Sequence, residues 1–334
     1  LPALLYLATR LTRMDNRDVR TLIKVMLVAV ALQSLLMIRE SAAGSSPLYE
    51  VQRGLLEGVK PAKGPFPFMW NASVFLAIWP PLFIYAIARA RDLKARIAWG
   101  VGLMLVLLAN THTMERAGLA ASLLAIMTCM MSSRLRKPVL VVLGLLAIGY
   151  LPWSTTRAGG SLLARFQETD KSRYAYRIAA INLLKSSDWD PIFGIGWARF
   201  DRLAGQHGTE EEVVAWGSRR ATVAEIAAGS RLHNVWLAML VEFGVVGALL
   251  TVGLAIMLLR AALALRARKR RGERIDGALF VAMTAALLSV AAIGYYQNVY
   301  MMAGSLSVAW VFYSILVTHP RVFALDESDQ PTRV

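Results

Sequence analysis

Apolar residues fill most of the chain in long runs separated by short polar segments. Such runs are typical of helices that cross a bilayer, which need about 20 predominantly apolar residues. Because the hydrocarbon offers the backbone no water to bond, we predict an all-α, polytopic transmembrane helical bundle. Pro80 and Pro81 predict a kink or break inside the second run. The runs are 21–38, 66–88, 97–113, 117–133, 138–152, 232–259, 276–296 and 299–318.

The order of these runs predicts four parts of the chain. They are N-terminal transmembrane helices over 1–152, one large helical loop over 153–231, C-terminal transmembrane helices over 232–318 and a cytoplasmic tail over 319–334. The chain opens with Leu1 and with apolar residues that resemble the end of a spanning helix. We therefore expect the chain to be truncated at its start.

Lysine and arginine are shared unevenly between the two sets of alternate loops. One set carries nineteen of them, in the segments 10–24, 89–96, 132–137 and 260–274. The short loops of the other set, counted without the large loop over 153–231, carry five, namely four within 39–65, Arg116, and none in 295–298. Cytoplasmic loops of membrane proteins are enriched in these residues, so the large loop is predicted to lie outside the cytoplasm. The net charge of +15 is thereby interpreted as a topology signal, and no nucleic-acid partner is expected.

Residues that commonly hold metals are scarce. The single cysteine, Cys129, lies in an apolar run, and the four histidines form no HxxxH spacing. We therefore expect neither a disulfide framework nor a protein-built metal site, and we predict no cofactor.

The large loop has the patterns of folded structure. Apolar residues recur at helical spacing over 172–186, and Thr209 and Glu212 have the spacing of a capping box that opens a helix predicted over 209–229. The segment WDPIFGIGWARF between them holds a proline and two glycines, which predict a turn that permits close backbone approach.

Two arginines of this loop are candidates for binding phosphate. Arg173 and Arg177 are four residues apart on the predicted helix, so both guanidinium groups project from one face. Arginine binds phosphate through two parallel hydrogen bonds and stays charged at any relevant pH. The alternative is a solvated helix in which these arginines pair with Glu168 or Asp170.

Further polar residues lie where outer segments meet predicted spans. Arg116 precedes a small-residue helix, and His233 and Asn234 open the run 232–259. A histidine that is neutral near pH 7 can take a proton from a hydroxyl, while Asn234 could orient that histidine or cap the helix. The alternatives are a snorkelling arginine and an interfacial or capping histidine. Glu242, about 14 Å further along the same predicted helix, is interpreted as structural.

These pieces occur in a defined order along the chain. An arginine before a small-residue helix is followed by R-x-x-x-R, then P-x-x-G-x-G, then HN-x-x-L-x-x-x-x-E-x-G-x-x-G at the next span. This set, over roughly 110–247, resembles the bacterial O-antigen ligase and O-antigen polymerase superfamily. The resemblance implies a GT-C-type fold of about a dozen spans, of which some three N-terminal ones would precede this chain. Glu115 stands where the family often has a small polar residue, which is a departure from its pattern.

The resemblance also implies an activity and a place for it. It implies a metal-independent, inverting glycosyltransferase of the bacterial inner membrane, with its active site on the periplasmic side among membrane lipids. The donor would be a glycan on undecaprenyl diphosphate and, for an O-antigen ligase, the acceptor a sugar hydroxyl of lipid A-core. The family's histidine corresponds to His233, its loop arginines to Arg173 and Arg177, and its earlier arginine to Arg116; Asn234 is placed beside the diphosphate with them.

The chemistry of that reaction agrees with these residue types. Fixed arginines stabilise the charge that develops on a diphosphate leaving group, and nearby cations lower the pKa of His233, which keeps it neutral. Other functions remain open. They are an O-antigen polymerase, a protein O-oligosaccharyltransferase, a scaffold and a transporter of lipid-linked sugars. A transporter predicts ionisable residues or broken helices near mid-membrane in paired halves, which the chain lacks apart from Glu242 and Pro80-Pro81.

Overall fold

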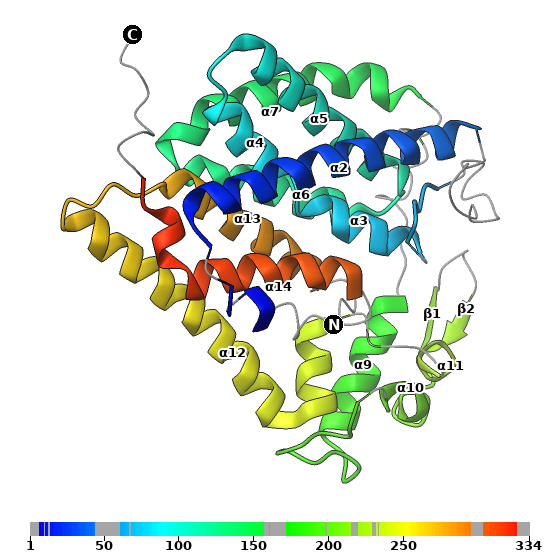
Figure 1. Cartoon of the computed structure of the whole chain (residues 1–334). Coiled ribbons are helices and arrows are strands. Elements are labelled where there is room, and N and C mark those ends of the chain that lie inside the picture. Colours follow the sequence, from blue (N-terminus) through cyan, green and yellow to red (C-terminus); the bar gives the residue numbers. More distant parts are fainter. Residues whose placement is uncertain are drawn as a thin grey trace. The chain divides into compact units, whose positions relative to one another are not determined.

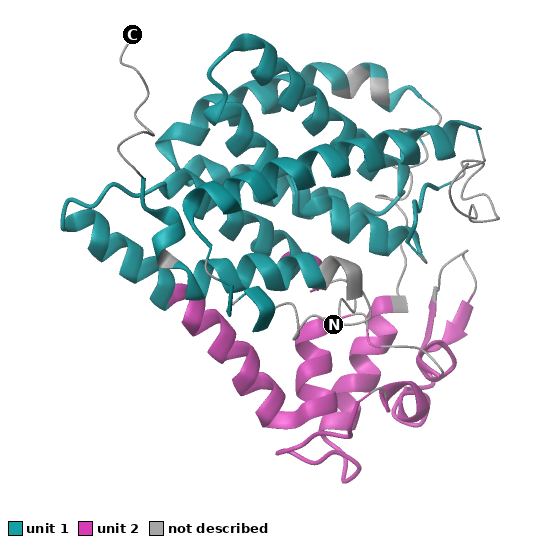
Figure 2. Cartoon of the chain, in the orientation of Figure 1, with its two compact units in different colours: residues 1–166, 260–291, 303–334 teal, residues 167–259, 292–302 magenta. Residues whose placement is uncertain are grey.

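The computed structural model describes most of the chain, and this part is mainly helical (Figure 1). Contacts divide the chain into two units (Figure 2). Unit 1 comprises 1–166, 260–291 and 303–334, and unit 2 comprises 167–259 and 292–302. The all-α membrane-bundle class is thereby confirmed. The described residues are 7–9, 11, 12, 14–43, 61–66, 68–156, 160, 172–197, 199–214, 220–228, 232, 234–294 and 303–325.

Unit 1 consists of helices that coincide with the predicted apolar runs. Within the described residues, five helical segments are long and apolar enough to cross a membrane, namely α2, α3 with α4, α5, α12 and α13. Helix α12 (Val235–Arg270) begins in unit 2 and ends in unit 1. The other elements of unit 1 are α2 (Asn16–Ala43), α3 (Met69–Ala77), α4 (Pro80–Arg89), α5 (Leu93–His112), α6 (Arg116–Thr128), η1 (Cys129–Met131), α7 (Ser133–Ser154), α13 (Gly277–Gly294, whose last turn falls in unit 2), α14 (Ala303–Thr318) and η4 (Pro320–Phe323).

The predicted break at Pro80-Pro81 is confirmed. Helix α3 ends at Ala77 and α4 begins at Pro80, because a proline has no N–H to donate and is tolerated in the first turn of a helix. Trp79, between the two helices, is fully buried, and its ring meets Phe312 of α14 edge-on at a centroid distance of 5.8 Å. The break therefore lies in the packed core of unit 1.

Hydrogen bonds between polar side chains connect α3, α5 and α6. Ser73 Oγ donates to Asn110 Oδ1 at 2.7 Å, and Asn110 Nδ2 donates to Ser122 Oγ at 3.1 Å. All three residues are buried. Gly118 permits this close approach, since a Cβ atom there would lie 1.7 Å from Ser73 Oγ. Small and hydroxyl residues are the usual means of bringing membrane helices together.

Unit 2 contains the large loop and the start of α12. Its elements before α12 are α9 (Ser172–Leu184), α10 (Phe200–Leu203), β1 (Glu212–Val214), β2 (Arg220–Thr222) and α11 (Val223–Ala227). Helix α9 confirms the helix predicted over 172–186. The helix predicted over 209–229 is wrong, because β1 and β2 form an antiparallel pair there.

The capping box of this segment lies one hairpin later than predicted. Thr222 Oγ1 accepts the N–H of Glu225 at 3.1 Å, and the Glu225 carboxylate accepts the N–H of Thr222 at 3.0 Å. The β-branched Val213 and Val214 favour a strand, so Glu212 begins β1 of a hairpin that Thr209 precedes, and α11 is the helix that is capped.

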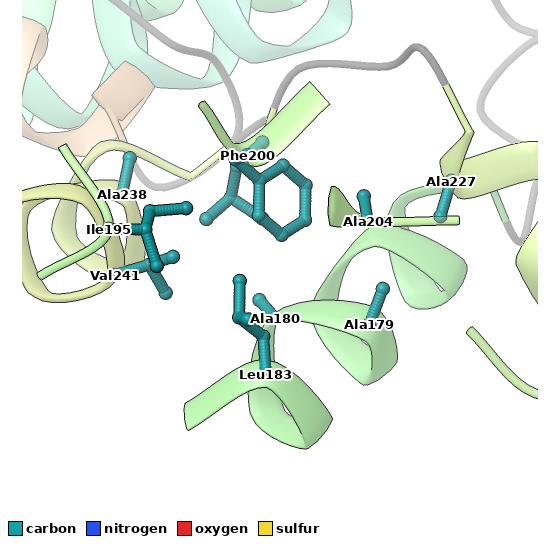
Figure 3. Close-up of a cluster of buried hydrophobic side chains, with 10 residues drawn as sticks. Ala179, Ala180, Leu183, Ile195, Phe200, Ala204, Ala227, Ala238 and Val241 are labelled. Atoms are coloured by element: carbon teal, nitrogen blue, oxygen red, sulfur yellow. The ribbon is translucent and has the colours of Figure 1, made fainter. Parts of the chain in front are cut away.

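The core of unit 2 joins α9 to the start of α12. Figure 3 shows the side chains of this core converging, with Phe200 at its centre. Small residues of α9 allow the elements to pack closely. Tyr174 and Ile181, two large residues of the apolar pattern over 172–186, are exposed and do not belong to this core. The buried members are Ala179, Ala180, Leu183, Ile195, Phe200, Ala204, Ala227, Leu232, Ala238 and Val241.

Candidate functional site

Helix α9 carries the two predicted phosphate-binding arginines. Arg173 and Arg177 lie one turn apart on it and are both half-buried, so their guanidinium groups issue from one face, as the spacing predicts. Helix α9 packs against the core of unit 2 through small residues such as Ala179 and Ala180, which are fully buried. Helix α9 therefore presents a basic face from a helix that the core of unit 2 holds in place. Glu168 and Asp170, the predicted alternative partners, lie outside the described residues.

Asn234 opens the helix that packs on α9. Its Oδ1 accepts the N–H of Leu237 at 3.0 Å, and its own side chain is buried. Of the two roles that the sequence left open for Asn234, helix capping is the one observed. Capping fixes where the segment 235–243 begins, and Ala238 and Val241 of this segment enter the same core as α9. His233, the residue immediately before Asn234, lies outside the described residues.

Helix α12 is interrupted at its tenth residue, Gly244. This glycine has φ 60° and ψ −152°, which no helical residue adopts. The sequence predicted one continuous span over 232–259, and that continuity is wrong. Glu242, which we placed deeper within an uninterrupted helix, stands next to the break and is buried. A sharp interruption of this kind leaves backbone groups that need new hydrogen-bond partners.

The segment 191–196 supplies those partners. Ile195 and Gly196 donate their N–H groups to the carbonyls of Val241 and Glu242, at 3.0 and 2.9 Å. In return, the N–H groups of Val245 and Val246 donate to the carbonyls of Pro191 and Ile192, at 2.8 and 3.3 Å. We call residues 191–196 with 241–246 the Gly244 junction.

Two glycines make the Gly244 junction possible. Gly194 has φ +69°, and a Cβ on it would lie 2.5 Å from the carbonyl carbon of Glu242. A Cβ on Gly244 would lie 2.4 Å from the carbonyl oxygen of Ile192. The obstructing atoms are backbone, so a larger residue would have to separate the two segments. The motifs P-x-x-G-x-G and E-x-G-x-x-G are therefore the two sides of one backbone contact.

The segment 192–197 exposes large apolar side chains that the sequence analysis did not single out. Ile192, Phe193 and Trp197 are 58%, 68% and 61% exposed. The Trp197 ring meets Phe243 edge-on at 6.0 Å. Their exposure could have been predicted from the sequence IFGIGW, because the glycines between these apolar residues have no side chains to shield them from solvent.

Arg116 lies in unit 1, at the first position of α6. The turn before it is unusual, because Met114 has φ 59° and is fully buried. A left-handed conformation costs a non-glycine residue about 1–2 kcal/mol, and such residues cluster at functional sites. Thr113 Oγ1 supports the turn by donating to the carbonyl of Asn110 at 2.7 Å. Arg116 thus emerges from a fixed turn next to the network of α3, α5 and α6.

The structure places the predicted site residues in two groups. Arg173, Arg177 and Asn234 belong to unit 2, and Arg116 belongs to unit 1. No group of three histidine, cysteine, aspartate or glutamate residues that could hold a metal ion occurs among the described residues. What the site offers chemically is therefore cationic and hydrogen-bonding, and it suits a polyanion such as a diphosphate.

These features define a class of protein. Several long apolar helices indicate a multi-pass membrane protein, and unit 2 of this protein carries two arginines one turn apart on α9. A family model described as O-antigen ligase matches residues 99–252, a range that contains Arg116, α9 and the Gly244 junction. This part of the chain belongs to the O-antigen ligase and polymerase superfamily, as its motifs predicted. A search of curated proteins finds no match. The family indicates a glycosyltransferase-like enzyme that acts on lipid-linked glycans.

Proposed function

We propose that the protein is an O-antigen ligase. It would move a polysaccharide from undecaprenyl diphosphate to a sugar hydroxyl of lipid A-core on the periplasmic face of the bacterial inner membrane. The observation that carries the proposal is the packing of α9, with Arg173 and Arg177, against the helix that Asn234 caps. This packing holds the helix that bears Arg173 and Arg177 against the segment that follows His233 in the sequence.

The residues divide the work of transfer between them. Arg173 and Arg177 bind the diphosphate and stabilise the charge that develops on it as the bond to the glycan breaks. Arg116 contributes a further cation, and Asn234 fixes the start of the helix. His233 takes the proton from the acceptor hydroxyl as this oxygen attacks the sugar from the face opposite the diphosphate, which inverts the anomeric centre. Because diphosphate is a good leaving group, neither a metal ion nor an acidic side chain is required.

Variants of these residues test the assignment. His233→Ala should lower the transfer rate by about 10²–10⁴-fold and leave donor binding in place. Arg177→Lys keeps the charge but loses the planar fork, so it should weaken donor binding as well as transfer. Each lost charge-assisted bond is worth about 1.5–3 kcal/mol. Binding of undecaprenyl-diphosphate glycan and the transfer rate are measured for each variant at equal expression.

Matched controls come from the same unit. His207, whose Nε2 lies 3.0 Å from Asp188 Oδ2, is the histidine control, as His207→Ala. Arg202, exposed on α10, is the arginine control, as Arg202→Lys. Both should transfer normally. Normal transfer by His233→Ala, or a defect of that variant confined to donor binding, would show that His233 is not the base.

A second experiment separates the ligase from its relatives. A strain that lacks the protein should lose all capped lipopolysaccharide and accumulate lipid-linked polymer, as seen on a gel. Caps one repeat long would instead indicate a polymerase. Unchanged lipopolysaccharide together with loss of glycosylated protein would indicate a protein O-oligosaccharyltransferase.

A further inference from the structure

A long groove in unit 1 is lined by none of the residues of the proposed site. It has a volume of about 1340 Å³ and runs between α5 and α7, with the ends of α4 and α6 at its borders. Its lining is almost wholly apolar, and several lining side chains are exposed, among them Val101, Val141 and Leu145. The inference drawn from this groove does not rest on the proposed function.

One end of the groove is strongly basic. Arg96 of α5 and Arg134 and Lys137 of α7 line it there, and all three are exposed. Helices α5 and α7 begin at Leu93 and Ser133, so both helices also direct their N-terminal ends toward the basic end. Helix N-termini carry partial positive charge and favour anions. Asp92 caps α5 and offsets part of this charge, so the positive potential at this end of the groove comes from the three cations and the N-terminus of α7.

The groove is long enough for a lipid tail. From Arg96 to Thr111 the α5 side of the groove covers sixteen residues, and the first and last of them are about 22 Å apart along a helix. One leaflet contributes half of a hydrocarbon core of about 30 Å, or about 15 Å, which the groove exceeds. Gly100 lines open space in the groove, because a Cβ atom there would meet nothing within 4 Å. A ligand with an acyl chain and an anionic head matches both parts.

We propose that this groove is a binding site for an anionic phospholipid. An acyl chain lies between α5 and α7, and the phosphate of the headgroup bonds Arg96, Arg134 and Lys137. Basic pockets between membrane helices are known to select anionic headgroups. Charge complementarity decides between this occupant and a protein helix, since an apolar helix would leave the three cations without a counter-charge.

Native mass spectrometry of the full chain tests the site. The protein is reconstituted with phosphatidylglycerol and phosphatidylethanolamine of identical acyl chains, and the lipid retained after detergent release is measured. We expect phosphatidylglycerol to be retained preferentially. The triple variant Arg96→Gln/Arg134→Gln/Lys137→Gln should retain on the order of tenfold to a hundredfold less of it.

The control triple variant changes three cations near the same helix ends that do not line the groove, Arg91→Gln/Lys94→Gln/Arg136→Gln. It has the same net charge as the first variant and should retain the lipid within about twofold of wild type. Equal loss in both triple variants would overturn the proposal in favour of general surface electrostatics. Equal retention of the two lipids by wild type would overturn it as well.

A second pair of variants tests the apolar part of the groove. Gly100→Leu fills the groove, whereas Gly144→Leu points into equally open space on α7 but does not line the groove. Gly100→Leu should lose the bound lipid and Gly144→Leu should keep it. A photo-crosslinker at Val101 should capture lipid; capture of polypeptide there, or displacement of the lipid by glycerol phosphate without acyl chains, would overturn the proposal.

Discussion

The Gly244 junction makes the sharpest prediction, which concerns Gly194→Ala. This substitution places a Cβ at φ +69° and 2.5 Å from the carbonyl carbon of Glu242. The left-handed conformation costs an alanine about 1–2 kcal/mol. Relief of the clash requires the two segments to separate, which breaks the hydrogen bonds of Ile195 and Gly196, each worth about 0.5–1.5 kcal/mol net. The junction should therefore lose about 2–5 kcal/mol.

Substitutions of two other glycines measure the conformational cost of alanine without a steric clash. Gly272 has φ +86°, and a Cβ on it would meet nothing within 4 Å, so Gly272→Ala should show the conformational cost alone, about 1–2 kcal/mol. Gly253 lies within α12, where a Cβ would also be unobstructed. Gly253→Ala should stabilise the helix by about 0.5–1 kcal/mol, because alanine is the better helix former.

Hydrogen exchange measured by mass spectrometry is the assay. A loss of 2 kcal/mol or more should accelerate exchange of peptides covering 190–197 and 241–247 by at least about thirtyfold. The exchange rates of peptides from α9, which does not belong to the Gly244 junction, should change little. The reasoning is refuted if Gly194→Ala exchanges at these positions as slowly as wild type, or if Gly272→Ala accelerates them equally.

Four other predictions follow from particular contacts. Gly118→Ala should destabilise unit 1 by about 1–3 kcal/mol because of the clash with Ser73 Oγ, whereas Gly144→Ala, with open space around it, should not; thermal unfolding in detergent measures both. Thr222→Ala should destabilise α11 by about 1 kcal/mol, and Thr209→Ala should have a smaller effect, as judged by exchange of the 220–228 peptide. Cysteines introduced at Gln206 and Arg268 should be labelled from outside and inside the cell respectively, and labelling of both from one side would contradict the predicted topology. Glycan transfer by the purified protein should persist in EDTA, and a loss restored by added magnesium or manganese would count against the proposed mechanism.

Hydrophobic patterning predicted the helices of unit 1 well because each of them is decided locally. A helix formed by an apolar run in a membrane makes its backbone hydrogen bonds within itself. The break between α3 and α4 is predicted directly by Pro80 and Pro81. Helix α9 and the order of the family motifs were also readable from the chain. Four of the five predicted site residues fall among the described residues, and their assigned roles in catalysis stay predictions.

The failures share a physical cause, which is pairing between distant segments. Nothing near Gly244 in sequence indicates an interruption, because the groups that satisfy it come from 191–196. The segment 209–229 likewise has a helical capping pattern at Thr209, but Val213 pairs with Ala221 across a hairpin. Helical periodicity is read from consecutive residues and contains no information about a distant segment that forms hydrogen bonds with them. Tertiary pairing therefore overrode the predicted helix in both cases.

The interruption of α12 has a consequence for the proposed site. Where a helix breaks near a membrane, its freed backbone groups must form hydrogen bonds within the protein. The segment that provides these hydrogen bonds then fixes the position of the break. Here the bonding segment, 191–196, lies between α9 and α12 in the chain and contributes Ile195 to the core that α9 shares with Val241. A shift of the segment 235–243 along its axis would therefore break hydrogen bonds at one end and the Asn234 cap at the other. Two fixed ends hold the start of this helix in register with the helix that bears Arg173 and Arg177.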